Sequence, residues 1–213
     1  MQETDFVSTT ADHPISSPPP DVTVAGMLLD QVLSRLSQFD IVGELLRRWW
    51  RVSPSGPVPR CLFDKALISI ESASHRLEQG PAEARRLAAE IMEASSRPWV
   101  MPPETPPRDL PKLFAEPNLR IEAVGIILAT AGTAAICLPE SDILFSVLSL
   151  NSEQRHRFAR DILQASDACI TFCDDDSPGL HDLMIWLRYA SFLLTLNFCG
   201  YAGKLQTTGL AQK

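Results

Sequence analysis

The chain has 213 residues, enough for one large domain or two small domains with a buried core. Apolar residues make up 45% and charged residues 21% of the chain, a composition that excludes disorder over the whole length. The 19 lysines and arginines are outnumbered by 26 aspartates and glutamates, and the resulting net charge of −7 disfavours direct binding to nucleic acid.

The sequence indicates a protein of a reducing compartment, either the nucleus or the cytoplasm. Residues 1–6 are polar and acidic, whereas a secretory signal has a basic start and an apolar stretch. The five cysteines are an odd number and most lie in apolar helical patterns, unlike a disulfide framework. Two apolar stretches, 123–138 and 189–203, are shorter than the roughly 20 residues that span a bilayer, so each is predicted to be a buried core helix.

Helical patterns follow one another along the chain after residues 1–20, which are predicted to form a disordered tail. Asp21 is expected to cap the first helix and Asp40 the second. Prolines within 53–59 stop the second helix, because proline lacks an amide hydrogen and clashes with the preceding turn. Seven helices are predicted, beginning near residues 21, 40, 61, 81, 117, 151 and 177.

Local signals mark several helix ends. Gly80 is expected to end the third helix and Pro81 to begin the fourth, following the usual preference for glycine after a helix and proline at its first position. Six prolines between 98 and 111 predict an extended linker. Asn151 and Gln154 have the spacing of a capping box at the start of the sixth helix.

The fold class predicted from these patterns is all-α, an irregular multi-helix bundle of about seven helices within residues 21–213. The chain contains no convincing strand pattern. Residues 143–150 form a short apolar run that is compatible with either a helix or a strand.

Two segments carry a distinctive combination of residues. Residues 113–129 read LFAEPNLRIEAVGIILA, and residues 181–190 read HDLMIWLRYA. The first resembles the phenylalanine, N-L-R-aromatic-E and G-I-I signature in the middle homology region of fungal zinc-cluster transcription factors. The second is similar to the N-D-x-x-x-W-L-x-Y-E helix that follows in that region. With an upstream stretch, 39–62, the similarity covers roughly residues 25–203.

The resemblance implies a helical regulatory region that restrains or licenses an activator through protein contacts. Three positions depart from the family pattern: Ile121 stands where an aromatic is common, His181 where asparagine is common, and Ala190 where glutamate is common. The family's DNA-binding module uses six closely spaced cysteines around two zinc ions, and no cysteine precedes Cys61 here. Because the chain also stops at Lys213, soon after the tryptophan helix, we expect a partial relative without the DNA-binding module.

The clusters that could carry chemistry favour structural roles. The three aspartates at 174–176 come just before a predicted helix start, where negative charge favours the helix dipole more than it indicates a metal site. Cys169 and Cys173 are predicted core residues. Residues 155–160, with three arginines and a histidine, are predicted to form a solvated basic face. We therefore expect no metal, no cofactor and no catalytic residue.

The predicted function is non-catalytic: a regulatory or interaction domain related to fungal transcription factors, acting through protein partners in transcriptional control. The expected partner is either an intact zinc-cluster transcription factor or a second copy of this chain, with no membrane and no direct nucleic-acid contact. The alternative is a helical small-molecule binder or cyclase-like enzyme of fungal secondary metabolism, built on the same scaffold around a small apolar ligand. A degraded gene product without function is a third interpretation.

Seven residues are predicted to contact a pocket ligand or a partner. The paired tryptophans of the second helix lie beside arginines and could form a docking edge. The others are polar or aromatic residues on apolar helices, where they could line a pocket. The full set is Trp49, Trp50, Asn118, Arg120, His181, Trp186 and Arg188.

Overall fold

The computed structural model describes residues 22–53, 60–100, 104–106, 109, 112, 115, 117–176 and 180–210. Every regular element in that part of the chain is a helix, which confirms the all-α prediction. The tail predicted at 1–20 lies outside the described residues. The helices are α1 (Val22–Leu36), α2 (Phe39–Val52), α3 (Arg60–Leu77), α4 (Pro81–Ser96), α5 (Ile121–Cys137), α6 (Ile143–Val147), α7 (Ser152–Asp176) and α8 (Asp182–Leu210).

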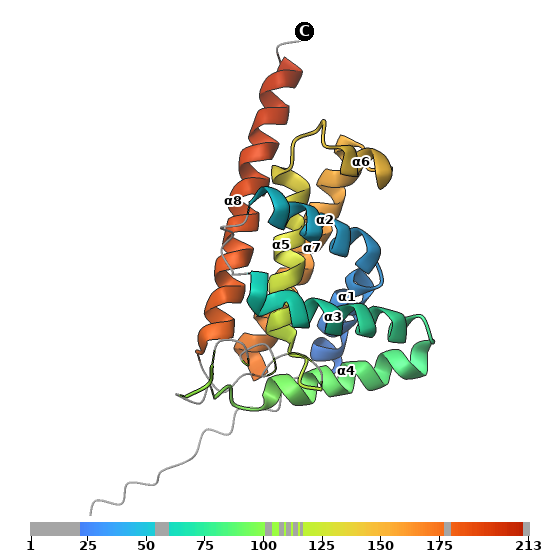
Figure 1. The fold of residues 1–213 in the computed structure, drawn as a ribbon, viewed down its shortest axis with the longest axis vertical. Helices are drawn as coiled ribbons and strands as arrows, with labels where there is room; N and C mark the ends of the chain where they lie inside the picture. The colour runs from blue at the N-terminus through green and yellow to red at the C-terminus, as the bar shows by residue number, and fades with distance from the viewer. Residues whose placement is uncertain are drawn as a thin grey trace, which may run out of the picture.

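Helix α5 runs through the middle of the molecule (Figure 1). Helices α7 and α8 pack along it, and α2 crosses it. Helices α3 and α4 pack against each other, with α4 at the end of the molecule where α8 begins (Figure 1). The last turns of α8 extend beyond the other helices, so its two ends have different surroundings.

Close packing around α5 depends on two glycines. Fifteen of its 17 residues are buried, which confirms the prediction of a core helix at 123–138. A Cβ atom on Gly125 would lie 2.6 Å from Leu187 Cδ1 and 2.9 Å from Cys169 Cβ. At Gly132, side-chain carbons of both α7 and α8 would lie 2.9 Å from such an atom. Glycine at these positions therefore allows α7 and α8 to approach the central helix.

The prediction that Asp40 caps the second helix was wrong, because α2 begins at Phe39 and its N-cap residue is Gln38, without a side-chain cap. The cap predicted at Asp21 lies outside the described residues.

Two other local signals for helix ends are confirmed. Gly80 has a φ of 115°, a left-handed backbone conformation that favours glycine, and Pro81 begins α4. Asn151 and Gln154 form a reciprocal capping box: the amide of Gln154 donates to Asn151 Oδ1 at 2.9 Å, and the amide of Asn151 donates to Gln154 Oε1 at 2.8 Å. The run at 143–150 contains α6, an eighth helix among the described residues.

The linker predicted over 98–111 falls between α4 and α5, and its described residues lie outside any α-helix. Helix α5 begins at Ile121, four residues later than predicted, because Arg120 has an extended backbone with φ −105° and ψ 149°. Helix α8 begins at Asp182 rather than near residue 177.

The basic run at 155–160 is not uniformly solvated, because Arg155 is only 3% exposed. Its guanidinium donates to the carbonyl oxygens of Ala135, at 3.0 and 2.7 Å, and Leu138, at 2.8 Å. The same group lies 3.6 Å from the centre of the Phe145 ring. The prediction of a solvated face was wrong for Arg155, which satisfies carbonyls that the end of α5 leaves without an intrahelical partner.

Candidate functional site

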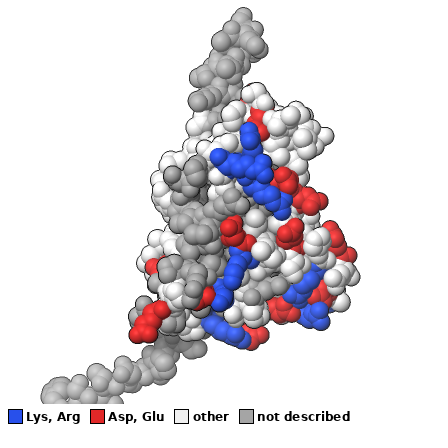
Figure 2. All heavy atoms as spheres, in the orientation of Figure 1, with Lys and Arg blue, Asp and Glu red and all other residues white. Residues whose placement is uncertain are grey.

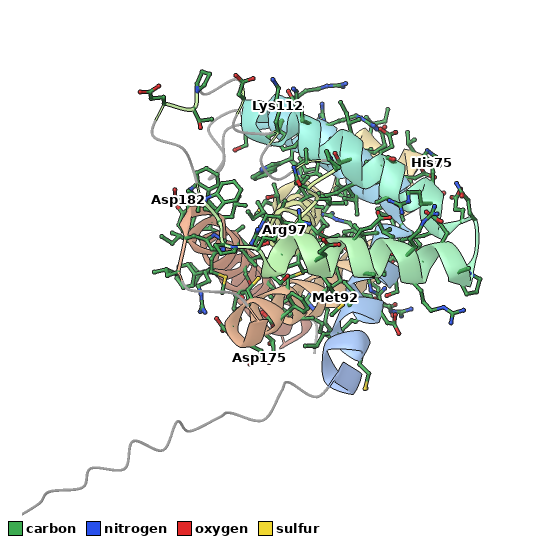
Figure 3. The ribbon with its side chains drawn as sticks, turned by 90° about the horizontal axis from the view of Figure 1, so that it is seen from below. His75, Met92, Arg97, Lys112, Asp175 and Asp182 are labelled. Carbon is green, nitrogen blue, oxygen red and sulfur yellow. The ribbon has the colours of Figure 1, made fainter. Side chains whose placement is uncertain are left out.

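Two of the predicted contact residues, Arg120 and His181, meet Glu122 in a buried polar cluster. The cluster lies where the end of α4 and the starts of α5 and α8 converge. Figure 3 views this end of the molecule, with Arg97 just after α4 and Asp182 at the start of α8. The side chains of Arg120, Glu122 and His181 are 4%, 0% and 9% exposed. A buried charge is costly unless it is paired and hydrogen-bonded. Each of these groups therefore offsets part of the desolvation cost of the others.

Arg120 connects α4 to α5 through all of its guanidinium N–H groups. Nη1 donates to the carbonyl oxygens of Ala94 at 2.7 Å and Arg97 at 2.9 Å, and Nη2 donates to the carbonyl of Ser95 at 2.9 Å. Nε and Nη2 also donate to the Glu122 carboxylate, at 3.2 and 2.8 Å. The last carbonyls of a helix lack intrahelical donors, so Arg120 caps α4 while it neutralises Glu122.

His181 joins the start of α8 to the same carboxylate. Its Nε2 lies 3.1 Å from Glu122 Oε1, and its Nδ1 accepts a long hydrogen bond, 3.4 Å, from the amide of Met184. In this arrangement Nε2 donates to the Glu122 carboxylate, and the contact from the Met184 amide to Nδ1 caps the start of α8. The Trp99 ring lies beside the cluster, 6.1 Å from the imidazole and 5.8 Å from Arg120 Cζ.

Glu122 provides the negative charge of the cluster. Burial raises the pKa of its carboxyl, but hydrogen bonds from His181 and Arg120 outweigh burial and hold this pKa below the ordinary glutamate value. Glu122 is therefore ionised at neutral pH. All five N–H groups of Arg120 and both ring nitrogens of His181 are engaged within the protein, so the cluster joins three helix ends and offers no unused donor to a ligand.

The two cysteines of α7 have the core role predicted for them. Cys169 is 0% exposed and Cys173 is 4% exposed. Burial raises the pKa of both thiols, and the nearby Glu122 carboxylate raises it further. Both therefore stay protonated at neutral pH and act as small apolar groups.

Residues of α4 contribute to the lining of two cavities. Asn118 and Arg120 line a cavity of about 140 Å³ beside Trp99. A larger cavity, about 680 Å³, lies between α3, α4 and the segment that leads into α5, and none of the seven predicted contact residues lines it. Its lining combines buried apolar side chains with a partly exposed ion pair, and comprises Ser72, Arg76, Leu87, Glu90, Ile91, Pro117 and Leu119.

Trp49 and Trp50 lie in α2, away from the buried cluster. Trp49 is partly buried and packs against the core, and Trp50 is 7% exposed. Trp50 lines a hollow of about 300 Å³ between α2 and α3, together with Arg47 and Arg51. The two indole rings thus contribute mainly to the packing of α2.

The outward face of α8 carries a row of large apolar side chains that the sequence analysis did not single out. Ile185, Tyr189, Phe192 and Leu196 are 48%, 48%, 56% and 52% exposed, and we call these four residues the α8 stripe. Their spacing of four, three and four residues places them on one helix face. The opposite face of α8 packs against α5 and α7. The prediction that 189–203 is a buried core helix was therefore wrong for this face.

The sequence did not distinguish the stripe from the buried face, because α8 is apolar on both faces. Leu187 and Leu194, on the inward face, are fully buried. Of the two remaining contact residues predicted in α8, Trp186 packs partly against the core, and Arg188 is half exposed and ion-paired with Asp174. The sequence signal for the stripe was the spacing of four, three and four residues from Ile185 to Leu196. Periodicity alone, however, does not show which apolar face of a helix other helices cover.

The acidic run at 174–176 ends α7 and does not precede a helix start, so that part of the sequence interpretation was wrong. Negative charge at a helix carboxyl end opposes the helix dipole, and Arg188 compensates Asp174 there. Among the described residues, no three histidine, cysteine, aspartate or glutamate side chains gather as a metal site.

The face shown in Figure 2 carries charges of both signs, mainly over α2, α3 and α4. Arg76, for example, forms ion pairs with Glu83 at 2.6 Å and Glu90 at 2.7 Å. These pairs lower the pKa of both glutamates through hydrogen bonds from Arg76. Basic groups over α3 and α4 are thus accompanied by neighbouring acids, whereas those over α2 form one contiguous group in Figure 2.

Comparisons of the chain with protein-family models, with curated proteins and with solved structures found no match. Within the described part of the chain, the segment Asp182–Gly200 of α8 is long and apolar enough to cross a membrane, judged by length and composition alone. Core helices of soluble proteins pass the same test, and 33% of this segment is buried inside the protein.

Proposed function

We propose that this protein is a non-catalytic interaction domain that acts in transcriptional control through a protein partner bound along the α8 stripe. The observation that carries the proposal is the row of four half-exposed large apolar residues on one face of α8. Contiguous apolar surface of this kind typically marks a site of protein–protein contact.

The link to transcriptional control rests on the resemblance of residues 113–129 and 181–190 to fungal zinc-cluster transcription factors. The two segments meet at the buried cluster, since Arg120 and Glu122 come from the first and His181 from the second. The asparagine common in the family at position 181 is also a good helix cap with a side-chain donor. One helix junction thus gives a physical reason for the two motifs to occur together.

A non-catalytic role is consistent with the hydrogen bonding of the buried cluster and the burial of the α7 thiols. The cluster uses its donors and acceptors to join helix ends, and the α7 thiols are buried and protonated. Such groups stabilise a surface that another protein recognises, because they hold α5 and α8 in a fixed relation.

The proposal is tested by comparing transcript profiles of the source strain with the gene intact, deleted, and restored with wild type or a variant. We expect deletion to shift a coherent set of transcripts, which the wild type restores and Phe192→Glu does not. Met27→Glu is the matched control, since it places the same charge at a residue 69% exposed on α1, and it should restore the profile. Unchanged transcripts after deletion would refute the proposed function.

The cavity of about 680 Å³ supports a second candidate, a small-molecule binder, because it lies in the size range of ligand sites and has apolar walls with a few polar groups. Native mass spectrometry of protein purified from its source would detect a retained ligand. Ser72→Trp, at the cavity lining on α3, should abolish that added mass if the ligand occupies this cavity. A wild-type mass equal to that of the bare chain would contradict this candidate.

A further inference from the structure

We infer that the partner of the α8 stripe is a second copy of this chain, seated by pairing of two α8 helices about a twofold axis. This inference rests on the proposed function and specifies its partner. It follows from the spacing of the stripe, the charges beside it and the area that it exposes.

The spacing of the stripe is self-complementary. Steps of four, three and four residues from Ile185 to Leu196 match the seam along which two helices interlock side chains. The pattern reads the same in both directions, so a twofold axis maps the stripe of one copy onto that of the other. In the antiparallel arrangement, Ile185 meets Leu196 and Tyr189 meets Phe192 across the axis. A twofold interface uses the same patch on both copies, as this pattern allows.

The charges beside the stripe permit two copies to meet despite the net charge of −7. Between residues 183 and 203, Arg188 is the sole charged residue, and it is ion-paired with Asp174 of its own chain. The twofold axis places the Arg188 side chains of the two copies on the same edge of the seam, and Asp174 of each chain neutralises its own Arg188 there. An anionic membrane surface is a poorer occupant, because it attracts clusters of lysine and arginine, which this segment lacks.

The exposed area predicts a reversible dimer. Since a large apolar side chain offers roughly 200 Å², four half-exposed side chains present about 400 Å² on each copy. Two copies together would bury about 800 Å² from the stripe alone, and neighbouring α8 surface adds to this, which places the interface at the small, transient end of specific complexes. We therefore expect dissociation in the micromolar range rather than a permanent dimer.

The test is sedimentation velocity of the full chain over about 1 to 100 µM, a range that brackets micromolar dissociation. We expect the wild type to pass from monomer to dimer, with at least a tenfold weaker association for Phe192→Glu and for Leu196→Ser. Met27→Glu should associate like the wild type. Circular dichroism melts verify that each variant folds, and Leu196→Ser provides the decisive result if Phe192→Glu does not fold. A wild type that stays monomeric, or stripe variants that dimerise normally, would overturn the inference.

The two proposals fail in different ways. A monomeric wild type together with a transcript shift that Phe192→Glu cannot restore would mean that the stripe binds a different protein, so the second copy is wrong and the proposed function stands. A stripe-dependent dimer with transcripts unmoved by gene deletion would support the inference and refute the function. Flotation of the monomer with anionic vesicles in place of dimerisation would also overturn the inference.

Discussion

Helices α5 and α8 are both long, apolar and nearly free of charge, yet the protein uses them differently. Nearly every residue of α5 is buried, because α2, α7 and α8 surround it and its glycines allow close approach. Helix α8 packs against α5 and α7 on one face only, and its stripe from Ile185 to Leu196 remains exposed. Hydrophobicity alone therefore does not separate a core helix from an interaction surface; the arrangement of neighbouring helices does.

The comparison extends to the charges at the two helices. Arg120 and Glu122 at the start of α5 are buried and fully hydrogen-bonded, whereas Arg188 on α8 and Asp174 form an exposed pair. A buried pair is costly to break, because the remaining partner keeps its desolvation penalty. A surface pair contributes little, because water and salt screen it.

The largest effect is expected from removing Arg120. Arg120→Ala removes the donor of three carbonyls at the end of α4 and leaves the buried Glu122 carboxylate with His181 but without its cationic partner. It should lower the free energy of unfolding by about 3–5 kcal/mol. Arg188→Ala, which removes the same type of side chain from the surface pair, should cost about 0–1 kcal/mol. Urea unfolding monitored by circular dichroism measures the loss of stability in each variant. Equal losses would contradict the distinction between the buried Arg120 pair and the exposed Arg188 pair.

The two faces of α8 can be compared with a single type of substitution. Leu187 is fully buried against α5, whereas Leu196 is 52% exposed. Leu187→Ala should destabilise the monomer by about 3 kcal/mol, because it removes buried methyl groups and leaves a cavity. Leu196→Ala should change the stability of the monomer by no more than about 0.5 kcal/mol. Unfolding at low protein concentration keeps dimerisation out of the result, and a large loss for Leu196→Ala would mean that the stripe is covered within the monomer.

A smaller effect is expected from pH. The pKa of Glu122 is lowered in the folded protein, so its contribution to stability is present above the unfolded glutamate pKa and is lost as pH falls toward the folded value. Stability of the wild type should decline between about pH 5 and pH 3, and Glu122→Gln should decline less steeply. Other carboxyls with lowered pKa, such as Asp142 beside Arg48, affect both proteins alike. Parallel pH profiles would show that the Glu122 carboxylate is not stabilised as the geometry indicates.

Local features were the best predicted from the sequence. The Asn151–Gln154 capping box and the Gly80–Pro81 junction each depend on residues within a few positions of one another, so the sequence pattern alone is enough to predict them. Arg155 shows where prediction from local sequence fails. It lies in a basic run that predicts a solvated face, but the end of α5 and the Phe145 ring bury it as a helix cap.

The site was predicted in part. Arg120 and His181 were singled out, but Glu122, which joins them, was not, because the three lie on segments about 60 residues apart. The α8 stripe was missed for a related reason. Periodicity identifies apolar positions, and coverage by other helices is a property of the whole fold.

The sequence by itself determined the all-α class, most helix boundaries and the absence of a cysteine ladder before residue 61, since these follow from local propensity, caps and composition. The tertiary structure decided which arginines are buried, which acids they neutralise and which face of α8 remains open. The physical reason is that burial and ion pairing depend on segments distant in the chain, whereas helix formation depends mainly on near neighbours.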